Sequence, residues 1–308
     1  LENINLENVA ADQVNAVWVD EDATEHADKV IVKGGSLAIE ENKIVDGVYR
    51  IVNVNDLKNL ATADDNNFAG KTAILLADLD LNNEEWTPIP TFNGTFDGNR
   101  KTIKNLVVTG NNSTVGLFGN TYNGEIKNLT IENAKVSGRL NVGVVAGNPY
   151  TSKYTNITVK GLVQVNGMAY VGGVGGKNAY ANWTNITVDV KEGSYVKANS
   201  VENGTAYRTY VGGVVGFNGE GTHSFTNITS NINVEGSTCD VGGMFGIAHY
   251  GNRFENLTCT GNVEITNAEE SEEAEEIGGI AGVWHNGGED VVFTNCKFTG
   301  EVTTNKER

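Results

Sequence analysis

The chain has 308 residues, with 22 Lys or Arg against 39 Asp or Glu, which gives a net charge of 22 − 39 = −17. So large an excess of negative charge argues against nucleic acid or an anionic membrane surface as a partner. A membrane-spanning helix needs about 18 or more consecutive apolar residues, and no such run is present. The 38 glycines and 3 prolines fit tight corners between strands whose N–H groups are needed for pairing.

Residues 1–47 lack the repeat that fills the rest of the chain. Residues 16–19, 29–33 and 36–40 are expected to be strands. We expect them to cover the first repeat, because an open β edge must be blocked. The alternative is that they end a preceding domain. The start Leu1-Glu2-Asn3 is typical of an exported chain whose leader has been removed.

Residues 55–61 form the one good helical pattern. Asn55 can cap this helix, and Leu57, Leu60 and Ala61 share one face. We therefore divide the chain into residues 1–70, a β element with a helical cap, and residues 71–308, the repeat domain.

The repeat domain is organised by two alternating phrases. The first is a six-residue glycine phrase, and its closing glycines are separated by 28, 29, 40, 30 and 36 residues. The second places Asn two residues after an aromatic or aliphatic residue and before a β-type run. The closing glycines are Gly119, Gly147, Gly176, Gly216, Gly246 and Gly282, and the recurring asparagines are Asn128, Asn156, Asn185, Asn227, Asn256 and Asn295.

Two signals at one period of about 28 to 30 residues predict a solenoid. Short runs of Val, Ile, Thr, Phe and Tyr, about three in each period, indicate strands. The predicted fold is all-β: a right-handed parallel β-helix of about seven coils, with a small N-terminal cap that contains a helix. The recurring Asn is expected to point inward and to stack on its copies as an amide ladder.

The order of several motifs in residues 49–300 resembles bacterial surface proteins that carry GLUG-type repeats. The motifs are Phe68-Ala69-Gly70-Lys71, Leu76 to Leu81, Trp86 to Ile89, Phe92 to Asn99 and Gly116-Leu117-Phe118-Gly119. The resemblance implies a protein exported by a Gram-negative bacterium, held at the outer cell surface and adhesin-like. A lipid anchor is one means of attachment that it suggests, and we expect a monomer.

Two insertions lengthen the period, one within residues 191–209 and one at residues 269–276. The second holds six glutamates. We expect a solvated, mobile loop there, with a calcium-responsive loop as the alternative. Extra residues in a solenoid usually emerge on one face, which is often the binding face.

A candidate binding strip follows the closing glycines. Aromatic residues recur two to four places after them, so successive coils could stack these side chains along one edge. Aromatic rings beside polar groups suit the C–H faces and hydroxyls of sugars. The alternative is that the rings only stack on each other and shield a turn. The candidate residues are Tyr122, Tyr150, Tyr180, His249, Tyr250, Trp284 and His285.

We expect a non-catalytic protein that binds a glycan or another host or bacterial surface ligand. A secreted polysaccharide lyase or glycoside hydrolase and a purely structural stalk are the alternatives. Asp78, Asp80 and Asp97 form the one carboxylate cluster, and we expect structural roles for them. The histidines lack metal-ligand spacing, and no cofactor is expected. Cys239, Cys259 and Cys296 are expected to be buried free thiols, with a bridge between coils as the alternative.

Overall fold

The computed structural model describes residues 44–199, 201, 202, 205, 206, 209–219, 221–237, 239–249, 252–266, 276–284 and 291–304; at 201, 202, 205, 206, 239 and 284 it describes the backbone only. Contacts divide the chain into two compact units, Leu1–Asp46 and Gly47–Arg308. The described part of the first unit holds strand β1 (Ile44–Val45). The strands predicted within residues 16–40 lie outside the described residues.

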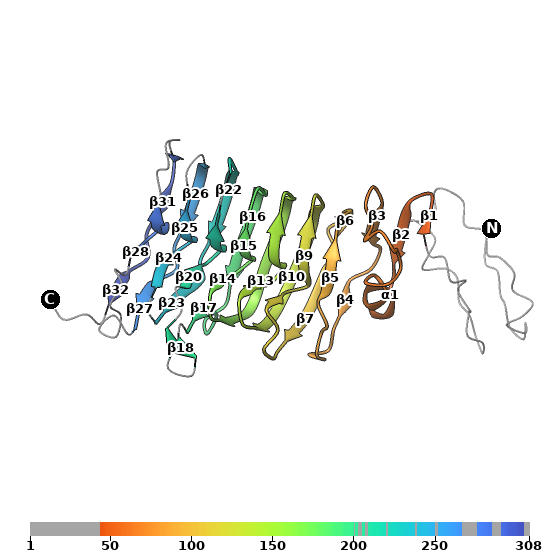
Figure 1. The fold of residues 1–308 in the computed structure, drawn as a ribbon, viewed down its shortest axis with the longest axis horizontal. Helices are drawn as coiled ribbons and strands as arrows, with labels where there is room; N and C mark the ends of the chain where they lie inside the picture. Colours follow the sequence, from red (N-terminus) through yellow and green to blue (C-terminus); the bar gives the residue numbers. More distant parts are fainter. Residues whose placement is uncertain are drawn as a thin grey trace, which may run out of the picture. The chain divides into compact units, whose positions relative to one another are not determined.

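Among its described residues the second unit is all-β apart from one short helix, and its strands pair in parallel, as predicted, except for one two-stranded hairpin. Figure 1 shows strands from successive repeats lying side by side. We call the strands of one repeat a rung. Parallel pairing begins with β2, N-terminal to the boundary expected at residues 70 and 71. No helix among the described residues is long and apolar enough to cross a membrane.

The glycine phrase is divided between two sheets. Its first half forms the six-stranded sheet and its second half the seven-stranded sheet, each with strands paired in parallel in chain order. The repeated phrases therefore do not lie in one sheet, because the chain turns sharply within each phrase. The six strands are β8 (Thr114–Val115), β11 (Asn141–Gly143), β14 (Tyr170–Gly172), β20 (Thr209–Gly212), β24 (Cys239–Gly242) and β28 (Ile277–Gly278). The seven are β5 (Ile89–Phe92), β9 (Phe118–Tyr122), β12 (Ala146–Tyr150), β15 (Gly175–Asn178), β21 (Val215–Asn218), β25 (Phe245–Ala248) and β29 (Ala281–Trp284).

The asparagine phrase lies in a larger sheet. Its members in the second unit are β2 (Val48–Ile51), β3 (Thr72–Leu75), β4 (Leu79–Asp80), β6 (Thr95–Asp97), β7 (Thr102–Val108), β10 (Glu125–Ser137), β13 (Lys153–Gly167), β16 (Asn182–Val190), β17 (Tyr195–Ala198), β22 (Ser224–Ser230), β23 (Asn233–Gly236), β26 (Arg253–Cys259), β27 (Val263–Ile265), β30 (Val292–Thr294), β31 (Lys297–Phe298) and β32 (Val302–Thr304).

Helix α1 (Val54–Asn59) lies where a helix was expected, but its cap differs. The Asn53 side chain, not that of Asn55, accepts a hydrogen bond from the Asp56 N–H at 2.9 Å. The backbone at Asn53 is extended, as an N-cap requires. Leu57 and Leu60 are buried, whereas Ala61, which was expected to share their face, is exposed.

The core is built from columns of like residues. One column stacks aromatic rings from successive rungs: Tyr154 on Trp183 with centroids 4.0 Å apart, and Phe225 on Phe254 with centroids 5.1 Å apart. Several polar side chains inside are hydrogen-bonded to one another. Tyr154 Oη and Thr121 Oγ1 lie 2.6 Å apart, and Asn178 Nδ2 donates to Asn218 Oδ1 at 2.7 Å.

The closing glycines allow successive rungs to approach at the backbone. A Cβ at Gly216 would lie 2.4 Å from the Val171 nitrogen of the preceding rung, and a Cβ at Gly246 would lie 2.5 Å from that of Val211. The surrounding atoms are backbone and cannot swing away. Glycine therefore recurs at this position because a larger residue would clash with the backbone of the preceding rung.

The recurring asparagines do form a ladder, but at the surface. Asn156, Asn185, Asn227, Asn256 and Asn295 are exposed, which corrects the expectation that they point inward. Each donates through Nδ2 to Oδ1 of the asparagine before it, at 2.9 to 3.2 Å, and Asn128 donates to Asp97 at 3.0 Å. All six have φ between 52° and 57°. Asn tolerates this left-handed conformation better than most residues, and there it turns the strand while its amide bonds along the stack.

The insertions both fall at the junction between the large sheet and the six-stranded sheet. Residues 195–198 belong to β17 and pair regularly, so the first insertion is narrower than the expected 191–209. It contains an antiparallel hairpin, β18 (Val201–Glu202) and β19 (Thr205–Ala206). The second comes between β27 and β28. Most of its acidic run, residues 269–275, lies outside the described residues.

We predict that Gly216→Ala lowers the free energy of unfolding by about 1–3 kcal/mol or more, because the methyl group meets fixed backbone. Gly119→Ala is the graded comparison, since its Cβ would lie 3.0 Å from the nearest atom, Pro90 O. Urea titration of both variants is the measurement. If both variants lost the same free energy of unfolding, a clash with the preceding rung would not explain why glycine recurs at the closing position.

We predict that Asn185→Ala lowers stability more than Asn185→Gly. Both variants lose the two ladder hydrogen bonds of Asn185. Only alanine adds the cost of a left-handed backbone, which is roughly 1–2 kcal/mol. Thermal unfolding of the two variants measures the difference. If alanine proves as stable as glycine, the conformation at this corner does not select the residue.

Candidate functional site

Three of the predicted tyrosines form a row at the corner between the seven-stranded sheet and the large sheet. Tyr122 and Tyr150 end β9 and β12 and are paired in register. Their rings are stacked, with centroids 5.1 Å apart and planes 7° apart. The Tyr180 ring lies 5.7 Å from that of Tyr150 and is turned by 64°. We call these three residues the tyrosine row.

Tyr180 enters the row from a different backbone position. Tyr150 is bridged to Ala179, so Tyr180 lies one residue further along than the other two tyrosines. Its φ is 58°, and Asn123 and Thr151 adopt similar values in the preceding rungs. The left-handed backbone turns the side chain back toward Tyr150. A second contact, edge to face with His223 at 5.8 Å, fixes the other side of the ring.

The row is accessible. Tyr122 is 47% exposed and Tyr180 is 41% exposed, whereas Tyr150 between them is half-buried. Stacking covers the shared faces of Tyr122 and Tyr150. The other side of Tyr122 faces the rung of β5, where Phe92 pairs with Thr121 and Asn93 follows. In that rung Asn93 stands at the place of Tyr122, so no further aromatic ring covers the outer face of Tyr122.

Of the remaining predicted site residues, His249 and the backbone of Trp284 are described, and Trp284 is out of line with the row. His249 is half-buried, and its backbone oxygen accepts a hydrogen bond from Asn252. Trp284 pairs in register with Ala248, which belongs to the column of Asn178 and Asn218. The expected alignment of Trp284 with the tyrosines was therefore wrong at the level of the backbone. The side chain of Trp284, and residues Tyr250 and His285, lie outside what the structure describes.

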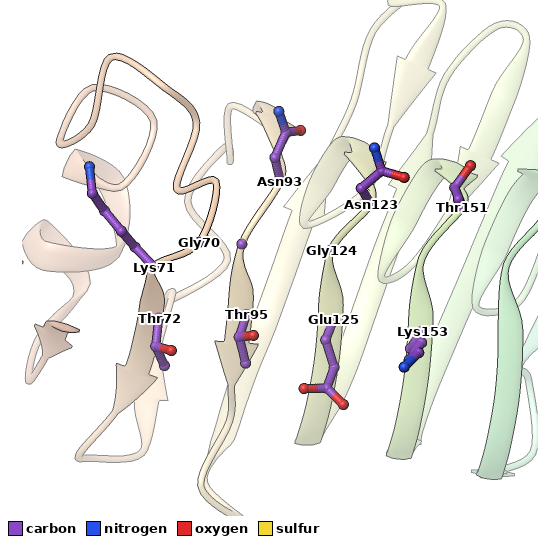
Figure 2. A pocket seen from close by; sticks show the side chains of 11 residues that line it. Gly70, Lys71, Thr72, Asn93, Thr95, Asn123, Gly124, Glu125, Thr151 and Lys153 are labelled. Atoms are coloured by element: carbon purple, nitrogen blue, oxygen red, sulfur yellow. The ribbon is translucent and has the colours of Figure 1, made fainter. Parts of the chain in front are cut away.

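A polar hollow of about 360 Å³ adjoins the row. Figure 2 shows its labelled side chains on four successive strands, each with one residue near the turn and one in the strand. Asn123 and Thr151 line it and directly follow Tyr122 and Tyr150 in the chain. The lining residues are Gly70, Lys71, Thr72, Asn93, Gly94, Thr95, Asn123, Gly124, Glu125, Thr151 and Lys153.

Charges in the hollow are mostly paired. Lys71 forms an ion pair with Asp64, and Glu125 forms one with Lys127 at 3.0 Å. Burial opposes ionisation of Asp64, but hydrogen bonds from Lys71 and from the Phe68 N–H keep its pKa below the usual value. Lys153 is exposed and makes no ion pair with a described residue. The hollow thus offers amides, hydroxyls and one available ammonium group.

A second aromatic cluster was not predicted. Tyr170 and Tyr210 stack on the six-stranded sheet with centroids 5.8 Å apart, and Phe217 contacts both rings edge to face at 5.1 Å. Lys177 Nζ lies 5.3 Å from the Tyr170 ring centre. The signal was available. Tyr170 and Tyr210 come just before the third and fourth glycine phrases. Lys177 and Phe217 come just after the closing glycines of the same two phrases.

The three aspartates considered for catalysis are engaged in backbone or ladder contacts. Asp97 begins the asparagine ladder and Asp80 begins a shorter one, accepting from Asn105 at 2.8 Å. Hydrogen bonds from the Asn82 N–H and from Asn105 lower the pKa of Asp80. Asp78 accepts from the Thr102 N–H at 2.7 Å. These contacts match the structural roles expected for the cluster.

None of the described residues form a group of three or more His, Cys, Asp or Glu able to hold a metal ion. Cys259 is free and buried, as expected, and burial raises the pKa of its thiol to about 11. Cys296 is free but half-buried, and burial also raises its pKa. The side chain of Cys239 lies outside the described set.

Comparison with known proteins identifies no family. No protein-family model matches the chain, and no curated protein matches it. A solved structure from Bacteroides ovatus, described as a "putative immunoglobulin A1 protease", is similar with 18% sequence identity and a TM-score of 0.48. The match covers 80% of this chain and 86% of that one.

Proposed function

We propose that this protein is a non-catalytic, adhesin-like glycan-binding protein of the bacterial cell surface, and that the tyrosine row with its adjoining hollow is the binding site. The observation that supports the proposal most is that two partly exposed tyrosines, Tyr122 and Tyr150, directly precede Asn123 and Thr151, which line a polar hollow. The surface location and the export rest on the resemblance of the sequence to GLUG-repeat proteins. We also infer that the three sheets close into a right-handed parallel β-helix of about seven coils.

Sugar rings need both kinds of group found here. A pyranose packs its C–H face on an aromatic ring and directs its hydroxyls at amide, hydroxyl and charged groups. Tyr122 offers an outer face and Tyr180 offers a turned ring. Asn123, Thr151 and Lys153 supply donors and acceptors within the neighbouring hollow.

A structural stalk remains the second candidate, because one observation favours it. The rings of Tyr122 and Tyr150 are nearly parallel in their stack, and the asparagine ladder runs through the same rungs. Rings that only shield a turn would contribute to stability and not to binding. Loss of a tyrosine would therefore weaken ligand binding if the row is a binding site, and would lower only the stability if the protein is a stalk.

We predict that Tyr122→Ala weakens binding to glycans found on an array by about tenfold, since one stacked aromatic contact contributes about that much. Tyr122→Phe should keep most of the affinity, because the ring face remains. Titration calorimetry with the strongest array hit is the measurement.

Tyr195→Ala is the matched control, because Tyr195 lies in β17 of the large sheet, away from the row. Thermal unfolding should show that each variant remains folded. The stalk would be favoured if the array gave no hit, or if Tyr122→Ala lowered stability and left binding intact.

A further inference from the structure

The hollow repeats the same columns in four successive rungs. The first residues of β3, β6, β10 and β13 are paired in register: Thr72 with Thr95, Thr95 with Glu125, and Glu125 with Lys153. Neighbouring strands of a sheet lie about 4.8 Å apart, so the four rungs extend over roughly 14 Å. The hollow is therefore elongated in the direction in which the rungs stack.

The place in the strand is polar in all four rungs, and the place near the turn is polar in three of them. Thr72, Thr95, Glu125 and Lys153 lie in the strand, and Asn93, Asn123 and Thr151 lie near the turn, where the first rung carries Gly70. Between these columns the second and third rungs carry Gly94 and Gly124. A Cβ there would lie 2.3 Å from Phe68 O and 2.8 Å from Gly94 O, respectively. No side chain fits at either place, so the space between the two polar columns is maintained.

We propose that the hollow binds an unbranched oligosaccharide in extended conformation, lying along the stacking direction with one sugar unit at each of the four rungs. This inference rests on the proposed function and names its ligand class. A repeating wall is best matched by a repeating ligand. The units of an extended β-linked glycan advance by nearly the spacing of neighbouring strands, about 4.8 Å, whereas residues of an extended peptide advance by only about 3.3 Å.

The chemistry of the wall agrees with this ligand. Hydroxyl groups both donate and accept hydrogen bonds, and so do the threonines and asparagines of the hollow. Paired charges at Lys71 and Glu125 leave the first and third rungs nearly neutral, so a neutral sugar meets no unpaired charge there. The available Lys153 ammonium group lies at the fourth rung and can donate to the last unit.

The test is calorimetry on the whole chain with cello-, chito- and xylo-oligosaccharides of two to six units. Affinity should rise about threefold or more for each added unit up to four, and then level off. Malto-oligosaccharides are the matched ligands for the cello series. They contain the same glucose units, but their α-linkage curves the chain, and the four-unit compound should bind at least tenfold more weakly.

A variant tests the position of each unit. Lys153→Ala should remove the gain from three to four units. Lys135→Ala, an exposed lysine on β10 away from the hollow, should change nothing. A loss that is equal at every length, or no loss at any length, would overturn the assignment of one unit to each rung.

The outcomes separate the inference from the proposed function. Failure of all three extended series, no gain beyond two units, or equal binding of the malto series would overturn the inference. Binding of other glycans that still depends on Tyr122 would leave the proposed function standing. An array without a hit would overturn both.

Discussion

Parallel backbone pairing in a repeated register is the constraint on which the rest of this protein depends. Each strand of the large sheet places its residues opposite their counterparts in the next rung, from Ile157 and Ile186 to Ile228 and Leu257. A residue type suited to a position in one rung is therefore suited to it in the next. The columns of buried aromatic rings, surface amides and glycines are consequences of this single arrangement.

The corners keep that register fixed. A slip by one residue would carry an inward side chain to the outer face. At the asparagine corner such a slip would also move a residue other than Asn into the left-handed conformation and break the amide chain. In the glycine phrase it would move a side chain against the backbone of the preceding rung. Two corners thus oppose slippage by different means, one by hydrogen bonding and the other by steric exclusion.

The sequence predicted the repeating elements well because their period is regular. The all-β class, the parallel pairing and the amide ladder all follow from phrases that recur at nearly constant spacing. The exposure of the asparagine side chains on the outer face did not follow from the sequence. Alternation along a strand assigns faces only while the backbone stays extended, and the left-handed Asn interrupts it. Counting residues from the closing glycine also predicted the wrong position for Trp284. It placed Tyr180 with the other tyrosines only because the turn at Tyr180 brings its ring beside that of Tyr150.

The hollow could not have been predicted in this way. Its residues differ from rung to rung, as Gly70, Asn93, Asn123 and Thr151 illustrate, so they form no motif. What they share is their place beside a turn, which becomes visible only when the rungs are aligned by their hydrogen bonds. The structural roles of Asp80 and Asp97 became clear in the same way, since each begins a ladder whose next member is more than twenty residues distant.

The β18–β19 hairpin has a consequence for how such a chain can change over generations. It adds a segment between β17 and β20, yet β20 still pairs in register with β14 before it and β24 after it. A gene encoding this architecture can gain coding sequence at that junction, or duplicate a whole rung, without disturbing the neighbouring pairs. Growth by unequal recombination would then lengthen the stack in steps of one rung, and new loops would arise at a junction away from the tyrosine row.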